Sequence, residues 1–162
     1  MLFSSMTFIY MFLPIVLLLY LVTKKELHNP ILLVASIIFY AWGEPKYLAI
    51  MLLTIIINYY GAISIDKFKK HKKLCLVMTI IANLSFLVYF KYFNFFIKNC
   101  NGLFHSNISA LNIIMPIGIS FYTFQALSYV VDVYRGEVKA QKDFYKLALY
   151  ICLFPQLVAG PI

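Results

Sequence analysis

The chain has 162 residues, of which 63% are hydrophobic and 12% are charged. A soluble domain carries about 45–50% apolar and about 25% charged residues, so the composition excludes an ordinary water-soluble globule. It also excludes a disordered chain, because disorder requires low hydrophobicity. The mean hydropathy of +0.85 therefore predicts a protein that crosses a membrane several times.

The net charge and the cysteines add further exclusions. Fourteen basic and six acidic residues give a formal net charge of +8, which in a soluble protein would suggest nucleic-acid binding. Here the basic residues alternate with long apolar runs, so we expect membrane lipid and no nucleic acid as a partner. Cys75, Cys100 and Cys152 lie at no CxxC or metal-ligand spacing. We expect three free thiols, no metal site and no bound cofactor.

The apolar runs predict an all-α fold, a polytopic transmembrane helical bundle of about five membrane segments plus an incomplete sixth. The first segment, residues 2–22, is uncharged, and Pro14 within it predicts a kink. The second, residues 30–42, is shorter than the ~20 residues of a straight span. The turn at residues 43–46 joins it to the third segment, residues 47–65, in a helical hairpin. The first arm either crosses the bilayer or re-enters it.

The second half of the chain contains the remaining segments. The fourth, residues 74–97, includes Asn83 and, near its far end, Lys91, whose long side chain can reach the interface. The fifth is residues 113–133. The last apolar stretch, residues 147–162, is broken by Pro155 and by Gly160–Pro161 and has no polar tail. We therefore expect residues 1–162 to be the N-terminal part of a single transmembrane domain, continued by the remainder of the same polypeptide.

The basic residues predict the orientation of the chain in a cell membrane. Eleven of the fourteen lie in the breaks that follow the first, third and fifth segments, and Lys46, Lys91 and Lys98 lie on the opposite side. Short cytoplasmic loops accumulate Lys and Arg. The N-terminus is therefore predicted to be extracytoplasmic.

Polar residues form a stripe on the fifth segment: Gly118, Tyr122, Gln125, Tyr129 and Asp132. Their spacing of 4, 3, 4 and 3 keeps them within an arc of roughly 80° on one helix face. Two interpretations stay open. These groups bond neighbouring helices and hold the bundle together, or they line a passage for substrate. Arg135, three residues after Asp132, is expected to neutralise that carboxylate.

The sequence contains no complete catalytic site. His28, His71 and His105 each fall in a predicted loop or beside several lysines, and no nucleophile motif or phosphate-binding glycine loop is present. The basic cluster at residues 66–73 has two explanations. It is a determinant of topology, or it binds anionic lipid or a phosphorylated cosubstrate.

Two long blocks resemble the membrane-bound O-acyltransferase (MBOAT) family, in its alginate O-acetyltransferase-like subgroup. They read MPIGISFYTFQALSYVVDVYRG at residues 115–136 and FPQLVAGPI at residues 154–162. The opening residues 2–5, Phe12-Leu13-Pro14 and residues 39–42 are also similar to that subgroup. The resemblance covers essentially the whole chain.

The resemblance implies an enzyme that moves an acyl group, here acetyl, from a cytoplasmic donor such as acetyl-CoA to an extracytoplasmic polysaccharide in a bacterial plasma membrane. It also implies an extracytoplasmic acetyltransferase as a partner. The expected catalytic histidine lies beyond the Gly-Pro block, so no catalytic residue is assigned in this chain, which is expected to be inactive alone. The residues expected to line the central cavity are Tyr122, Gln125, Tyr129, Asp132 and Gln156.

Three alternatives stay open. Within the family, the acyl group could be D-alanine and the acceptor teichoic acid. From the residues alone, the chain could be a transporter or channel subunit with Gln125 and Asp132 on its pathway, or a membrane scaffold without chemistry.

Overall fold

The computed structural model describes residues 6–43, 45–104, 116 and 118–159, and each regular element in these residues is a helix. The predicted all-α class is confirmed. Within the described residues, two helices, Pro45–Lys67 and Lys72–Asn101, are long and apolar enough to cross a membrane. The opening residues 2–5 and the beginning of the predicted fifth segment lie outside the described residues.

The N-terminal helix has an irregular turn immediately before Pro14, the residue at which the sequence predicts a kink. A π-helical turn, η1 (Phe8–Phe12), leads directly into α1 (Leu13–Val22), which has Pro14 in its first turn. Proline has no backbone N–H to donate to the preceding turn, and a wider π turn relieves the clash between its ring and that turn. A short 3-10 turn, η2 (Lys25–Leu27), then connects to α2 (His28–Gly43).

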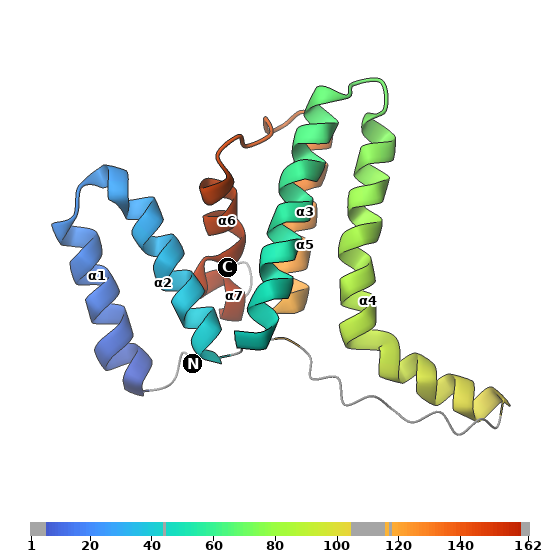
Figure 1. The fold of residues 1–162 in the computed structure, drawn as a ribbon, viewed down its shortest axis with the longest axis horizontal. Coiled ribbons are helices and arrows are strands. Elements are labelled where there is room, and N and C mark those ends of the chain that lie inside the picture. Colours follow the sequence, from blue (N-terminus) through green and yellow to red (C-terminus); the bar gives the residue numbers. More distant parts are fainter. Residues whose placement is uncertain (1–5, 44, 105–115, 117, 160–162) are drawn as a thin grey trace.

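The turn after α2 lies where the sequence predicts it, but the two helices that it joins do not pack together as the arms of a hairpin. The chain passes through η3 (Pro45–Tyr47) into α3 (Leu48–Lys67), and α2 then diverges from α3 (Figure 1). Instead, α2 packs mainly against α6 (Phe144–Cys152) and α1. Ala35 and Ser36 are buried on α2, and their small side chains leave room for α6 to pack against this face. α6 therefore lies between α2 and α3, the two helices expected to form the hairpin.

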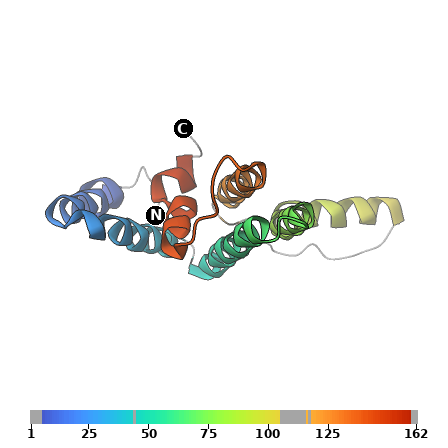
Figure 2. The same ribbon diagram turned by 90° about the horizontal axis from the view of Figure 1, so that it is seen from above.

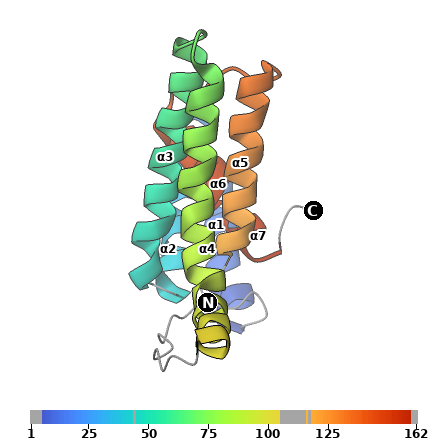
Figure 3. The same cartoon turned by 90° about the vertical axis from the view of Figure 1, so that its right-hand side faces the viewer.

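The remaining long helices form a three-helix group. α3, α4 (Lys72–Phe104) and α5 (Ile119–Arg135) lie side by side and pack against one another (Figure 3). The C-terminal part of α4 turns away from α3 and α5 (Figure 1). α6 and the short α7 (Phe154–Ala159) lie between this group and the α1–α2 pair (Figure 2). The C-terminal segment thus joins the two halves of the fold.

Two buried clusters follow this division. The larger includes Met51, Ile55, Tyr122, Val130 and Ile151, from α3, α5 and α6. In the smaller, four aromatic rings meet. They belong to η1, α2 and α7, and are Phe8, Phe12, Phe39 and Phe154. Aromatic packing of this kind anchors the beginning of α7 against the N-terminal helices.

Two buried amides join α3 to α4. Asn58 and Asn83 are 0% and 1% exposed, and each side chain donates to the other, at 2.8 and 3.1 Å. Each Nδ2 also donates to the carbonyl four residues earlier, of Thr54 and Thr79 respectively. Nearby, Gly61 faces Thr79 so closely that a Cβ would lie 2.4 Å from its Oγ1. The two helices can therefore approach closely around a satisfied polar pair.

We expect Asn58→Leu to lower the free energy of unfolding by about 1–2 kcal/mol, because Asn83 loses its reciprocal partner inside an apolar contact. Unfolding by SDS in mixed micelles, followed by circular dichroism, measures the change. The double variant Asn58→Leu/Asn83→Leu is expected to lose less than the sum of the two single variants. Additive losses would contradict an energetic coupling between the amides.

Candidate functional site

The helix break between α6 and α7 organises the surroundings of the predicted site residues. In an unbroken helix the Phe154 N–H would donate to the Tyr150 carbonyl, but the helix ends at Cys152 and Pro155 follows. Both backbone groups have side-chain partners instead. The Phe154 N–H donates to Ser36 Oγ at 3.2 Å, and the Tyr150 carbonyl accepts from Gln125 Nε2 at 2.7 Å.

Two of the predicted site residues meet at this break. Gln125 Nε2 donates not only to the Tyr150 carbonyl but also to Gln156 Oε1, at 2.7 Å. Beside this amide pair is a cavity of about 480 Å³ with a mixed apolar and polar lining: Phe121, Phe124, Gln125, Ser128, Tyr150 and Gln156. The same amide thus holds the broken helix and faces a cavity.

Close contact between α5 and α7 brings together the two sequence blocks that resemble the O-acyltransferase family, residues 115–136 and 154–162. Gly118, the N-cap residue immediately before α5, has φ +75°, a left-handed conformation that glycine adopts without strain. A Cβ at this position would lie 2.5 Å from the Leu157 carbonyl oxygen. A side chain is therefore excluded by both the backbone conformation and the available space.

The other residues of the polar stripe face either the buried core or a cavity, depending on their angular position around α5. Tyr122 is 1% exposed and belongs to the larger buried cluster, so it lines neither of the cavities found beside α5 and α6 in the described residues. Tyr129 and Asp132 line a second cavity of about 290 Å³. Because the stripe spans roughly 80°, the edge with Tyr122 faces the core and the edge with Gln125 and Asp132 faces the cavities.

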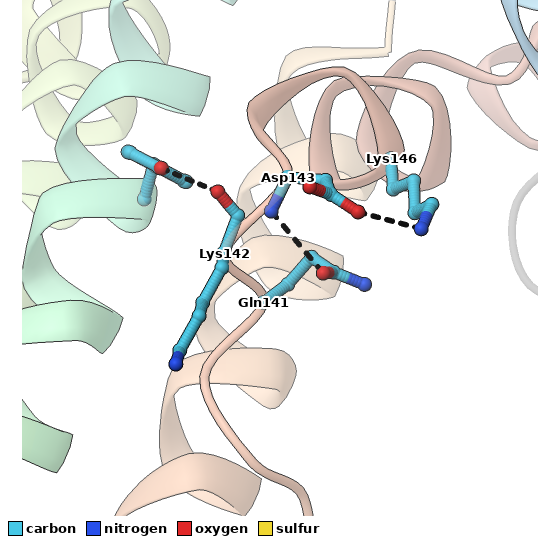
Figure 4. Close-up of polar contacts among 5 residues, drawn as sticks. Gln141, Lys142, Asp143 and Lys146 are labelled. Carbon is cyan, nitrogen blue, oxygen red and sulfur yellow. Dashed lines mark hydrogen bonds and ion pairs between the residues drawn. The ribbon is translucent and has the colours of Figure 1, made fainter.

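The loop of residues 136–143 covers the second cavity and is held by two tyrosines. The Tyr129 hydroxyl accepts from the Gln141 N–H at 2.8 Å, and the Tyr59 hydroxyl donates to the Lys142 carbonyl at 2.7 Å. Further along, the Lys146 ammonium donates to Asp143 (Figure 4), and this bond raises the pKa of Lys146. Phenols on α3 and α5 therefore fix the course of this loop.

The expected pairing of Asp132 with Arg135 is wrong. The Arg135 guanidinium instead lies 3.9 Å from the Glu137 carboxylate, because the chain turns at Gly136, with φ +83°, and brings Glu137 back toward the end of α5. Asp132 lines the second cavity, whose other lining residues include Lys139 and Lys146.

Residues with catalytic or metal-binding chemistry do not gather elsewhere in the described part of the chain. It contains no group of three or more His, Cys, Asp or Glu side chains that could hold a metal ion. His28 begins α2, packs its ring against Tyr20 in a tilted arrangement and bonds the Thr23 carbonyl through Nε2 at 3.1 Å. His71 is exposed, and His105 lies outside the described residues. The three cysteines are free.

Ser36 and Tyr150 are parts of the site that sequence reasoning missed. Their contributions follow from the break in the helix, where the main-chain N–H of Phe154 and the carbonyl of Tyr150 need new partners. Pro155 was the available signal. A proline in an apolar helix predicts freed backbone groups, although it does not say which side chains satisfy them.

Comparison with known proteins shows similarity over the whole chain. It is 37% identical to the probable alginate O-acetylase AlgI of Pseudomonas syringae and 36% identical to that of Pseudomonas aeruginosa, over 100% of this chain and 33% and 32% of those proteins. It is 33% identical to the peptidoglycan O-acetyltransferase of Helicobacter pylori, over 99% of this chain and 36% of that protein. No family model matches the chain, and no solved structure matches it significantly.

The resemblance to alginate O-acetyltransferases is thereby confirmed. Over its whole length the chain is similar to proteins named as alginate O-acetylases and as a peptidoglycan O-acetyltransferase. It spans about a third of the length of the curated relatives it matches.

Two glycine variants test the contact between α5 and α7. Gly118→Ala must place a side chain in a left-handed conformation, at a cost of about 1–2 kcal/mol, and must also displace the Leu157 carbonyl. Gly136→Ala has the same conformational cost, but nothing lies within 4 Å of its Cβ. We expect Gly118→Ala to lower the free energy of unfolding by about 1 kcal/mol or more beyond Gly136→Ala, measured by SDS unfolding. Equal losses would show that α7 moves aside freely.

Proposed function

We propose that the chain forms part of a membrane-bound O-acyltransferase that transfers an acetyl group from a cytoplasmic donor, such as acetyl-CoA, to an extracytoplasmic polysaccharide. The observation that carries the proposal is the similarity, over the whole of this chain, to about a third of alginate and peptidoglycan O-acetyltransferases. These relatives support acetyl transfer over D-alanyl transfer and over transport. Membrane lipid, the polysaccharide acceptor and an extracytoplasmic acetyltransferase are the proposed partners.

The proposed role of this chain is to line the route of the acetyl group. Gln125 and Gln156 have amides beside the larger cavity, and Tyr129 and Asp132 line the smaller one. Tyr150 borders both cavities, so the two are neighbours along α5 and α6. At membrane depth, irregular backbone is tolerated where it is buried in protein or lines a polar cavity. The broken helix at Leu153 supports a polar passage here.

We propose a bundle of about five spans with the N-terminus outside the cytoplasm. α3 and α4 have the length and composition of spans. Five lysines lie in their connection or at the helix ends beside it: Lys67, Lys69, Lys70, Lys72 and Lys73. α1, α2 and α5 are proposed to cross alongside them. The cytoplasmic side is then the side of the α3–α4 connection.

Gln125→Leu tests the proposed passage, because it removes the bonds to the Tyr150 carbonyl and Gln156. We expect acetylation of the cell-surface polysaccharide to fall roughly tenfold in cells whose own gene carries this change. Acetate released from the isolated polysaccharide by mild alkali measures it. Loss of solute flux with unchanged acetylation would instead support a transporter.

Ser36→Ala is the matched control for that experiment. It removes the bond at the other side of the same helix break, but Ser36 does not line the cavity. Both variants are expected to lower stability by about 1 kcal/mol, whereas only Gln125→Leu should strongly reduce acetylation. Equal losses of acetylation would mean that Gln125 acts only by holding the break together.

The proposed orientation is tested with cysteines. Cys100 is exposed near the end of α4, and Lys70→Cys places a thiol in the α3–α4 connection. In a background without the other native cysteines, a membrane-impermeant maleimide should label Cys100 in intact cells and should label the substituted position 70 only after lysis. Labelling of position 70 from outside would reverse the topology.

A further inference from the structure

A third cavity lies at the shared end of α3, α4 and α5, away from the helix break. It has a volume of about 230 Å³ and a largely polar lining. Asp66 comes from the last turn of α3, Lys69 from the connection, Lys72 from the first residue of α4 and Arg135 from the last residue of α5. Three helices and the connection between two of them thus bring three cations and one carboxylate to one cavity.

Among the described residues, two of the three cations at this cavity, Lys69 and Lys72, have no carboxylate partner, and the third has a weak one. In the described residues the ion pairs are Arg135–Glu137 and Lys146–Asp143, so no carboxylate there lies within 4.0 Å of the Lys69 or Lys72 ammonium. The Arg135–Glu137 separation of 3.9 Å between exposed side chains is a weak pair that an incoming anion can replace. The cavity therefore keeps an excess of positive charge.

Local structure favours binding of a small, strongly charged anion. The Lys72 ammonium lies 4.9 Å from the centre of the Tyr134 ring, a cation–π contact that places it at the cavity. It also stands at the N-terminus of the 33-residue α4, where the helix dipole favours negative charge. The Arg135 guanidinium offers a planar fork that matches two phosphate oxygens. Asp66 opposes an anion, so the favoured ligand is one compact group beside the three cations.

The position of the cavity at the ends of the helices indicates that the compact anionic group is a phosphate. The two helices long enough to cross a membrane meet here, one ending at Lys67 and the other beginning at Lys72. Phosphates of lipid head groups lie at the ends of such helices, and basic clusters there attract them. We infer that Lys69, Lys72 and Arg135 form a binding site for a phosphate group, carried by an anionic lipid or by a soluble phosphate compound. This site is separate from the proposed acetyl route.

The test compares two triple variants of the full chain that remove equal charge. The cavity variant is Lys69→Gln/Lys72→Gln/Arg135→Gln. The control variant is Lys67→Gln/Lys70→Gln/Lys73→Gln, whose positions do not line the cavity. The substituted side chains at the cavity are exposed, so both proteins are expected to fold, which circular dichroism and size-exclusion chromatography in detergent check.

Native mass spectrometry at fixed ionic strength then measures binding of two probes, phosphatidylglycerol and inorganic pyrophosphate. The cavity variant should bind at least one probe about tenfold or more weakly than the control variant does. Loss of phosphatidylglycerol alone identifies a lipid site, and loss of pyrophosphate alone a site for soluble phosphate. Equal binding of both probes by the two variants would overturn the proposed site. Binding would then depend only on the total positive charge around the α3–α4 connection.

Arg135→Lys provides a second, milder measurement. It keeps the charge but removes the guanidinium fork, so affinity should fall about threefold or more if Arg135 binds two oxygens. Unchanged affinity for both probes would remove Arg135 from the site.

Discussion

The rest of this structure depends on how a broken helix satisfies its backbone. Between α6 and α7 the regular hydrogen bond from Phe154 to Tyr150 is absent, and two other helices supply the missing partners, Ser36 from α2 and Gln125 from α5. An unsatisfied backbone group costs several kcal/mol in an apolar medium. The requirement to satisfy both groups therefore brings α2 and α5 to opposite sides of the same segment, and this joins the two halves of the fold.

The fold class and most helix positions could be predicted from the sequence because they depend on local pattern. The apolar runs and the turn after Gly43 each depend on a few adjacent residues. The packing of α2 could not be predicted in this way. A turn between two apolar segments suggests neighbours, whereas the small face at Ala35 and Ser36 selects a partner more than a hundred residues away.

The site shows the same limit of local reasoning. Gln125, Tyr129 and Asp132 lie beside cavities of the chain, whereas Tyr122 is buried in the core, and the spacing of the stripe alone does not distinguish the two environments. The Gln125 amide bonds the backbone of a neighbouring helix, as the first interpretation of the stripe expects, and it also borders a cavity. Asp132 was assigned the wrong neighbour, because the positive φ of Gly136 sends Glu137 back toward Arg135.

The loop of residues 136–143 is held by tyrosines that bond only its main chain, the Gln141 N–H and the Lys142 carbonyl. Every residue type except proline has both groups, so substitutions in this loop can change the charge and size of the cavity wall while its course stays the same. Related chains that retain Tyr59 and Tyr129 can therefore have different side chains lining this cavity while the loop keeps the same backbone course. The ligand selectivity of the cavity can then evolve without a change in the stability of the fold.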